Sequence, residues 1–98
     1  MSGKKSSENT LYLIQASYAA APLALSKLQQ LYTSGNQVVL MGESVMHAAH
    51  EAIQALENCY VLENEQPLLN SAQNNIQLIN YGQFAALCLQ FTRCISIK

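Results

Sequence analysis

The chain has 98 residues and a formal net charge of -1, and 50% of its residues are hydrophobic whereas only 11% are charged. This length suits a single domain with one core. The five Lys and Arg residues are too few and too dispersed for the basic stripe that phosphate binding needs, so we do not expect direct binding of nucleic acid. The scarcity of charge favours a surface that partners partly cover, and a neutral surface rich in Asn and Gln is the alternative.

No apolar stretch approaches the length of a membrane span, and the first residues lack the basic-then-apolar pattern of a signal peptide. We therefore expect a cytoplasmic protein. The three cysteines, Cys59, Cys88 and Cys94, follow neither a metal-ligand spacing nor a redox CxxC spacing. Their odd number favours reduced thiols over a disulfide framework.

The polar, Ser-rich residues 1–9 predict a disordered tail, which leaves residues 10–98 as a single domain. β-Branched, aromatic and apolar residues predict a first strand from Thr10 to Gln15. A helix follows, with Pro22 in its first turn and an apolar stripe at helical spacing. Gly35 then stands where a left-handed residue commonly ends a helix.

The apolar run from Gln37 to Met41 is bounded by turn formers and predicts a central strand buried on both faces. Ser44 is placed to cap the next helix with its hydroxyl group. One buried stripe is predicted on that helix, made by Val45, Ala48, Ala49, Ala52 and Leu56. The histidines His47 and His50 fall on its outer side.

Three further strands are predicted, over Cys59–Leu62, Ile76–Ile79 and Arg93–Ile97. The connection after the first of them can hold a short helix after Pro67, and Asn80 is placed to cap the last helix. The apolar face of that last helix comprises Tyr81, Phe84, Ala85, Leu87, Cys88 and Phe91. Because strands alternate with helices, the chain predicts a three-layer α/β/α fold around a mostly parallel sheet of about five strands.

Parallel sheets bind ligands beyond the carboxyl ends of their strands. The loops expected there contain no GxGxxG, Walker, GxSxG or paired-cysteine motif, so we predict neither a catalytic site nor a cofactor. His47 and His50, with Glu43 and Glu51 near them, could bridge a metal across successive helical turns. Such residues more often keep a helix face in solvent, so we predict no metal site and retain the two histidines as candidates.

A reactive cysteine needs a thiolate that a partner can reach. Cys88 lies on the apolar face of the last helix and Cys59 begins a buried strand, so we predict both as small core residues. Cys94, next to Arg93, is the remaining candidate for a reactive thiol, although strand alternation can turn it inward. Tyr18 falls in a loop and could line an interface.

Several short segments together carry a resemblance to a known family. They are Leu11-Tyr12-Leu13, Gly35 with Val38-Val39-Leu40-Met41, Val45-Met46-His47-Ala48-Ala49, Tyr60-Val61-Leu62-Glu63 and Asn80-Tyr81-Gly82-Gln83-Phe84. In this order they resemble segments of the DsrH/TusB family. The first resembles its opening strand, and the second resembles its glycine and apolar strand. The last three resemble its "DGV-aromatic-AA" segment, its "YVL-acidic" strand end and its "DY-x-x-F" entry to the last helix. Members of that family are small α/β subunits of bacterial sulfur-relay complexes.

The chain departs from the family pattern in several places. Gly42-Glu43-Ser44 replaces an acidic residue followed by Gly, Asn80 stands for Asp, and the aromatic residue common at the C-terminus is missing. Some sulfur-oxidising members carry a cysteine in the first helix, seven residues before the glycine, where this chain has Leu28. Sulfur carriage at that position is excluded, and the chain resembles the thiolation branch of the family more.

The resemblance implies a non-catalytic subunit of a TusBCD- or DsrEFH-like assembly, in which a TusD-like partner carries the persulfide cysteine. Sulfur would pass from a TusA-like donor toward 2-thiolation of the wobble uridine in certain tRNAs, and the identity of the final acceptor stays open. The implied partners are TusC/TusD-like or DsrE/DsrF-like paralogues in a hetero-oligomer. The isolated chain could form a homodimer.

The candidate contact surfaces are the turn after the central strand and the start of the last helix. Their residues are Gly42, Glu43, Ser44, Val45, Met46, His47, Tyr81 and Phe84. Two alternatives stand beside the interaction subunit. One is a sulfur carrier that uses Cys94 or Cys59, and the other is a small metal-binding module that uses His47 and His50.

Overall fold

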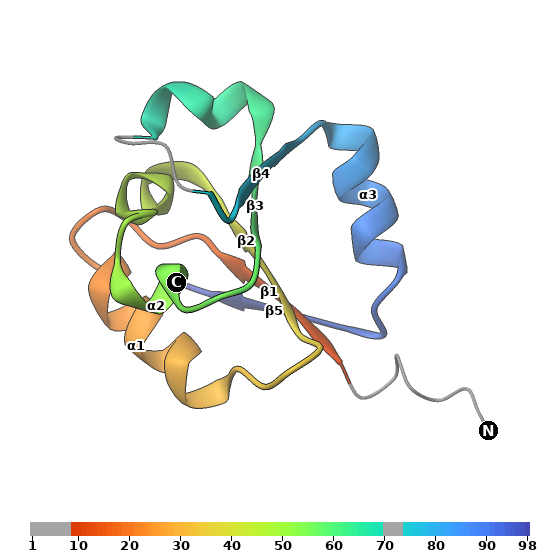
Figure 1. Ribbon diagram of the computed structural model, residues 1–98, viewed down its shortest axis with the longest axis horizontal. Helices are drawn as coiled ribbons and strands as arrows, with labels where there is room; N and C mark the ends of the chain where they lie inside the picture. Colours follow the sequence, from red (N-terminus) through yellow and green to blue (C-terminus); the bar gives the residue numbers. More distant parts are fainter. Residues whose placement is uncertain (1–8, 70–73) are drawn as a thin grey trace.

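A single parallel sheet organises the computed structural model, which describes residues 9–69 and 74–98. Its strands are β1 (Thr10–Ile14), β2 (Gln37–Leu40), β3 (Cys59–Leu62), β4 (Ile76–Ile79) and β5 (Arg93–Ile97), in the order β4-β3-β2-β1-β5 across the sheet. Every pairing is parallel. The predicted α/β fold is thus confirmed (Figure 1), whereas residues 1–8 of the predicted tail lie outside the described residues.

Helical segments connect the strands and form the outer layers. They are α1 (Ala21–Leu31), the 3-10 helix η2 (Gly42–His47), α2 (Glu51–Gln54), the 3-10 helix η3 (Glu63–Leu68) and α3 (Tyr81–Leu89). Figure 1 shows α1 and α2 on one side of the sheet and α3 on the other. Within the described ranges, no helix is long and apolar enough to cross a membrane.

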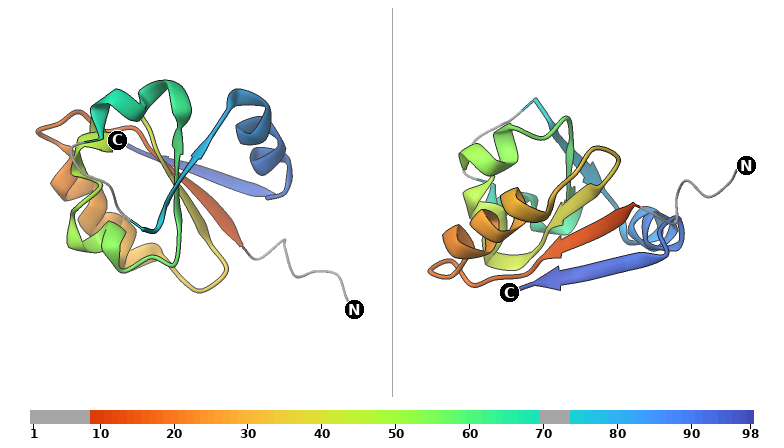
Figure 2. Two further views of the ribbon diagram at one scale, coloured as in Figure 1. Left: turned by 45° about the horizontal axis from the view of Figure 1, so that its top comes forward. Right: turned by 90° about the horizontal axis from the view of Figure 1, so that it is seen from below.

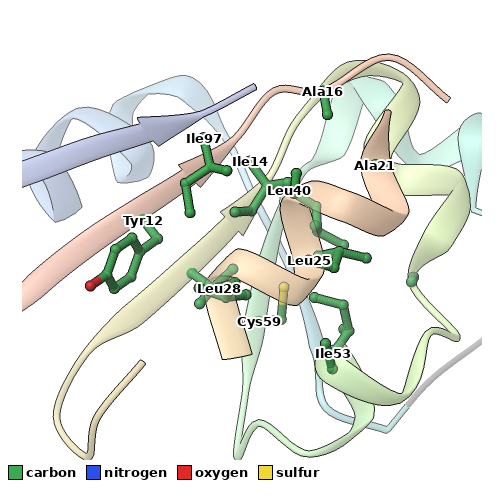
Figure 3. Packing of buried hydrophobic residues seen from close by; sticks show 14 of the residues in the cluster. Tyr12, Ile14, Ala16, Ala21, Leu25, Leu28, Leu40, Ile53, Cys59 and Ile97 are labelled. Carbon is green, nitrogen blue, oxygen red and sulfur yellow. The ribbon is translucent and has the colours of Figure 1, made fainter. Parts of the chain in front are cut away.

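The main core lies between the sheet and α1. Leu25 and Leu28 of α1 point toward the strands, where Ile14, Leu40 and Cys59 meet them (Figure 3). All these side chains are buried. Burying one leucine fully is worth roughly 1.5 to 3 kcal/mol, so this face of the sheet supplies much of the stability of the fold.

The opposite face of the sheet has a thinner cover. Strand alternation places Leu11, Val39, Leu62 and Ile79 on this face, and all four are buried. The helix α3 lies on this side of the sheet, as the two views of Figure 2 show, yet none of its own residues is buried. The apolar residues of α3 are therefore divided between the sheet and the molecular surface.

The predicted helix from Ser44 to Leu56 is wrong as one continuous element. Its stripe residues Val45, Ala48, Ala52 and Leu56 are buried as predicted, whereas Ala49 is exposed. The backbone leaves the helix at His50, whose φ and ψ are -59° and 144°. The His50 ring accepts a hydrogen bond from the Ala52 amide and so caps the separate helix α2. A side chain that bonds its own backbone competes in this way with helix continuation.

Two other predicted element ends also differ from the structure. The first helix ends at Leu31 with an extended Tyr32, so Gly35 is not its C-cap. Gly35 still adopts a left-handed conformation, with φ 95°, in the turn before β2. The short helix predicted after Pro67 instead spans Glu63–Leu68 and contains the proline. Its acidic first turn complements the positive helix N-terminus.

The remaining strand predictions agree with the structure to within one residue. β3, β4 and β5 have the predicted bounds, while Gln15 and Met41 lie just outside β1 and β2. Val38, Val39 and Leu40 of β2 are all fully buried. This confirms the central strand that is covered on both faces.

Candidate functional site

The loops that follow the strands gather at one edge of the sheet, because all five strands run in the same direction. We call this edge the carboxyl edge and define its exposed and half-buried surface by Tyr18, Glu43, His47, Asn64 and Tyr81. These residues come from the connections after β1, β2, β3 and β4. They are the side chains with which a ligand or partner would first make contact here.

The connections after β1 and β2 are fastened to each other. The Tyr18 amide donates to Glu43 Oε1 at 2.7 Å, and His47 Nε2 lies 2.9 Å from the Tyr18 carbonyl oxygen. Because a carbonyl oxygen only accepts, His47 Nε2 carries the proton in this contact. The rings of Tyr18 and His47 also meet, with centroids 4.4 Å apart and an interplanar angle of 32°. Tyr18 and His47 thus form one continuous patch of the surface.

The backbone amides at the carboxyl edge are largely satisfied by the chain itself. The Gly42 amide donates to Glu65 Oε2 at 2.9 Å. The buried Ser44 Oγ lies 2.8 Å from the Ile14 carbonyl oxygen and 2.6 Å from that of Met41, and its single proton is available to either. It also accepts from the Met41 amide at 3.3 Å. Ser44 thus locks the turn after β2 onto the end of β1 and does not cap an α-helix as predicted.

The start of α3 completes this edge. Asn80 Oδ1 accepts from the Gln83 amide at 2.7 Å, and Gln83 Oε1 accepts from the Asn80 amide at 2.9 Å. This reciprocal capping box confirms the predicted N-cap. Asn64 Nδ2 donates to the Tyr81 hydroxyl at 3.2 Å, which joins the connection after β3 to the first residue of α3.

The predicted contact residues are distributed unevenly between surface and core. Glu43 and Tyr81 are exposed. Four further residues are half-buried: Gly42, Met46, His47 and Phe84. Ser44 and Val45 are fully buried, so in this conformation they support the turn and cannot touch a partner. Gly42 has φ 61°, which suits the tight turn there.

Asn64 and Glu65 were expected in a loop at the carboxyl edge, but they were not predicted as contact residues. Both belong to η3, which was predicted to begin only after Pro67. Their partners, Tyr81 and Gly42, are 17 and 23 positions away in the chain. The sequence feature nearest to Asn64 and Glu65 was the acidic end of the Tyr60-Val61-Leu62-Glu63 segment.

The three cysteines lie toward the other edge of the sheet. Cys59 begins β3, Cys94 is the second residue of β5, and Cys88 stands near the end of α3. Cys59 is a buried core residue, as predicted, and burial raises its pKa to about 12. Burial also raises the pKa of Cys88, helped by its neighbour Cys94, although Cys88 is only half-buried. Cys94 is exposed.

The two histidines are engaged with the backbone. His47 Nε2 bonds to Tyr18 and His50 Nδ1 accepts from the Ala52 amide at 3.0 Å. In residues 9–69 and 74–98, no three His, Cys, Asp or Glu side chains are grouped so that they could hold a metal ion. His47 and His50 therefore gain no further ligand from the described chain.

Two clefts lie beside the helices. One of about 330 Å³ separates α3 from β3 and β4 and is lined by Tyr60, Gln77, Ile79, Gln83, Ala86, Leu87 and Gln90. The other, of about 240 Å³, lies between α1 and α2 and is lined by Leu28, Gln29, Tyr32, Ala52, Ala55 and Leu56. Their linings contain amides, tyrosines and apolar groups but no carboxylate, imidazole or thiol.

No protein-family model matches this chain, and no significant match is found among curated proteins or among solved structures. The resemblance to the DsrH/TusB family accordingly stays a prediction from the sequence pattern.

Proposed function

We propose that this protein is a non-catalytic subunit of a sulfur-relay complex of the TusBCD or DsrEFH kind. It supports the passage of persulfide sulfur toward 2-thiolation of the wobble uridine of tRNA. The observation that carries this proposal is the incomplete burial of α3, the only helix on its face of the sheet within the described residues. The family resemblance supplies the identity of the partners.

An apolar helix that buries none of its residues leaves a surface suited to a partner. Tyr81 is 63% exposed and Leu89 is 87% exposed, while Phe84 and Leu87 are half-buried. No charged residue occurs anywhere in α3. Depletion of charge together with exposed aromatic and aliphatic groups is typical of the centre of a protein interface.

The carboxyl-edge surface extends this candidate interface. Tyr18 is 52% exposed; its backbone is bonded to Glu43 and His47, and its ring packs against the His47 ring. A tyrosine that is already ordered loses little side-chain entropy when a partner covers it. Tyr18 and Tyr81 are thus the aromatic residues that we expect to anchor the TusC/TusD-like or DsrE/DsrF-like paralogues.

The placement of the thiols favours a subunit that does not itself carry sulfur. A carrier cysteine must be reachable and must ionise. Cys59 is fully buried and its pKa is raised to about 12, so it meets neither condition. Cys94 is reachable but is the second residue of β5, away from the carboxyl edge. We therefore assign the persulfide cysteine to a TusD-like partner that receives sulfur from a TusA-like donor.

Co-expression with the paralogous subunits of the same cell tests the proposed interface. We expect a hetero-oligomer on size-exclusion chromatography, and Tyr81→Ala or Leu89→Ala should weaken it about tenfold or more, as for an interface anchor. Leu31→Ala is a matched control because Leu31 also ends its helix and is exposed, but lies on the α1 side of the sheet. Equal effects of Leu31→Ala and Leu89→Ala, or no complex at all, would contradict the proposed surface.

Sulfur transfer through the assembled complex separates the interaction subunit from the carrier. We expect the Cys59→Ala, Cys88→Ser, Cys94→Ser triple variant to assemble and to sustain transfer of labelled sulfur at the wild-type rate. If transfer stops while assembly is intact, the carrier function through Cys94 is favoured instead. Stoichiometric zinc in the purified wild-type protein would favour the metal-binding module.

A further inference from the structure

Cys88 and Cys94 are close neighbours although they belong to different elements. The turn formed by residues 90–92 joins the last part of α3 directly to β5 (Figure 1). The Cys94 thiol lies 3.9 Å from the Cys88 carbonyl oxygen. Burial raises the pKa of Cys88, and the neighbouring Cys94 adds to this rise through its charge and a side-chain hydrogen bond.

Both cysteines lie on the α3 side of the sheet. Cys94 pairs in register with Leu11, whose side chain is buried on the face of the sheet opposite to α1. Parallel neighbours in register point to the same face, so Cys94 points toward α3. Cys88 belongs to the half-buried residues of that helix and its following turn, which recur at helical spacing: Phe84, Leu87, Cys88 and Phe91.

We propose that Cys88 and Cys94 form a redox-active dithiol, which closes to an intramolecular disulfide by exchange with a low-molecular-weight disulfide such as glutathione disulfide. The site is a reversible modification site that joins the end of α3 to the start of β5. Exchange of this kind requires a reachable thiolate and a second thiol beside it. Cys94 meets the condition of access because it is exposed, and the half-buried Cys88 supplies the second thiol.

The exchange takes place in two steps. The Cys94 thiolate attacks one sulfur of glutathione disulfide, breaks its S–S bond and releases one glutathione thiolate, which leaves a mixed disulfide on Cys94. The Cys88 thiolate then attacks the Cys94 sulfur, forms the protein disulfide and expels the second glutathione thiolate. The two protein thiols lose two electrons and two protons; glutathione disulfide takes up the electrons, and the released thiolates or water take the protons.

The environment favours Cys94 as the attacking group and Cys88 as the resolving one. Cys94 is exposed, so glutathione disulfide can reach it. The charge of Cys94 is one of the causes that raise the pKa of Cys88. When Cys94 enters the mixed disulfide it loses that charge, and Cys88 can then ionise more readily.

Cys59 cannot replace either member of the pair. It belongs to the core under α1 on the opposite face of the sheet (Figure 3). The sheet itself therefore separates it from Cys94. The exchange also needs no partner protein, so its test is independent of the sulfur-relay proposal.

The test incubates the full-length reduced protein with glutathione disulfide. The thiols that can be titrated after denaturation should fall from three to one, because only Cys59 remains free. Trypsin cleaves after Arg93 and so separates Cys94 from Cys88. We expect the peptide 94–98 to be linked to the peptide 28–93 until a reductant is added. The latter also contains Cys59, so the link must persist in Cys59→Ala.

Single variants distinguish the two roles. Cys88→Ser should stop at the mixed disulfide and retain glutathione on Cys94, whereas Cys94→Ser should lose most of the reaction because Cys88 is half-buried. The proposal is overturned if the wild type stays singly glutathionylated, if it links only between molecules, or if the internal link disappears in Cys59→Ala.

Discussion

The thiol of Cys59 is fully enclosed by apolar side chains under α1, and its pKa rises from 9.0 to about 12 because burial disfavours the thiolate. Between these two values the unfolded chain loses a proton that the folded chain keeps. The folded state then binds more protons, so the free energy of unfolding falls as the pH rises through this window. Below pH 9 the contribution of Cys59 to stability is fully present.

Cys59→Ala should remove this part of the pH dependence. Between about pH 9 and pH 10.5 the wild type should lose roughly 2 kcal/mol more stability than the variant, at about 1.4 kcal/mol per pKa unit. Urea unfolding under reducing conditions at both pH values gives the change of the free energy of unfolding with pH for each protein. The variant is expected to be less stable at neutral pH because a small cavity remains. Equal slopes would mean that Cys59 ionises in the folded protein as readily as in the unfolded chain.

At the carboxyl edge, hydrogen bonds between residues near in the sequence could be predicted, whereas those between distant residues could not. Asn80 was identifiable as a cap because its partner Gln83 is only three residues away. The partners of Tyr18 and Gly42, which are Glu43 and Glu65, are 25 and 23 positions away. Such pairings depend on which strands are neighbours in the sheet, and one sequence does not specify that order locally.

At the scale of elements, α3 depends on its cap more than a buried helix would. The capping box of Asn80 and Gln83 satisfies backbone groups at its start, whereas none of its residues is buried. A helix with so little packing draws less stability from tertiary contacts. Its local stability is therefore sensitive to the N-cap.

Asn80→Ala should destabilise α3 by about 1 kcal/mol, the usual cost of losing an N-cap acceptor. Hydrogen exchange of the α3 amides is the direct measurement, and their protection should fall roughly fivefold, as this energy implies. Asn80→Asp keeps the acceptor oxygen and serves as the control, with protection close to that of the wild type. If Asn80→Ala and Asn80→Asp behave alike, the side chain is not acting as a cap.

The segment from Gly42 to Gln54 marks the limit of pattern-based element prediction. Apolar spacing correctly selected Val45, Ala48 and Ala52 as buried, because burial follows hydrophobicity. It failed to divide the segment into η2 and α2, since the division depends on the bond between His50 and the Ala52 amide. A capping side chain in the middle of a periodic segment leaves the hydrophobic spacing almost unchanged.

At the scale of the whole molecule, the sheet is most strongly protected at its centre. β2 is covered on both faces and lies between β1 and β3, whereas β4 and β5 are the two edge strands. Amides of β1 and β2 should therefore exchange slowest with solvent, and those of β4 and α3 fastest among the regular elements. Hydrogen exchange of the reduced protein, followed by mass spectrometry or NMR, measures this order. Protection of α3 equal to that of β2 would contradict it.

The overall architecture was predictable because its signals are repeated along the chain. Alternation of apolar runs and helical stripes requires crossover connections, and these lead to a parallel sheet. The unequal cover of its two faces was not predictable, since the stripe of α3 is as apolar as that of a buried helix. Only the sheet order and the single helix on the second face reveal how much of that stripe stays exposed.

The strand order also has a consequence for synthesis on the ribosome. β1 pairs on one side with β2 and on the other with β5, the last strand of the sheet to be translated. Strands β1 to β4 can assemble while the chain is still growing, but the outer side of β1 has no partner until β5 emerges. A nascent chain therefore presents an open strand edge, a known site of misassembly, until β5 has been made.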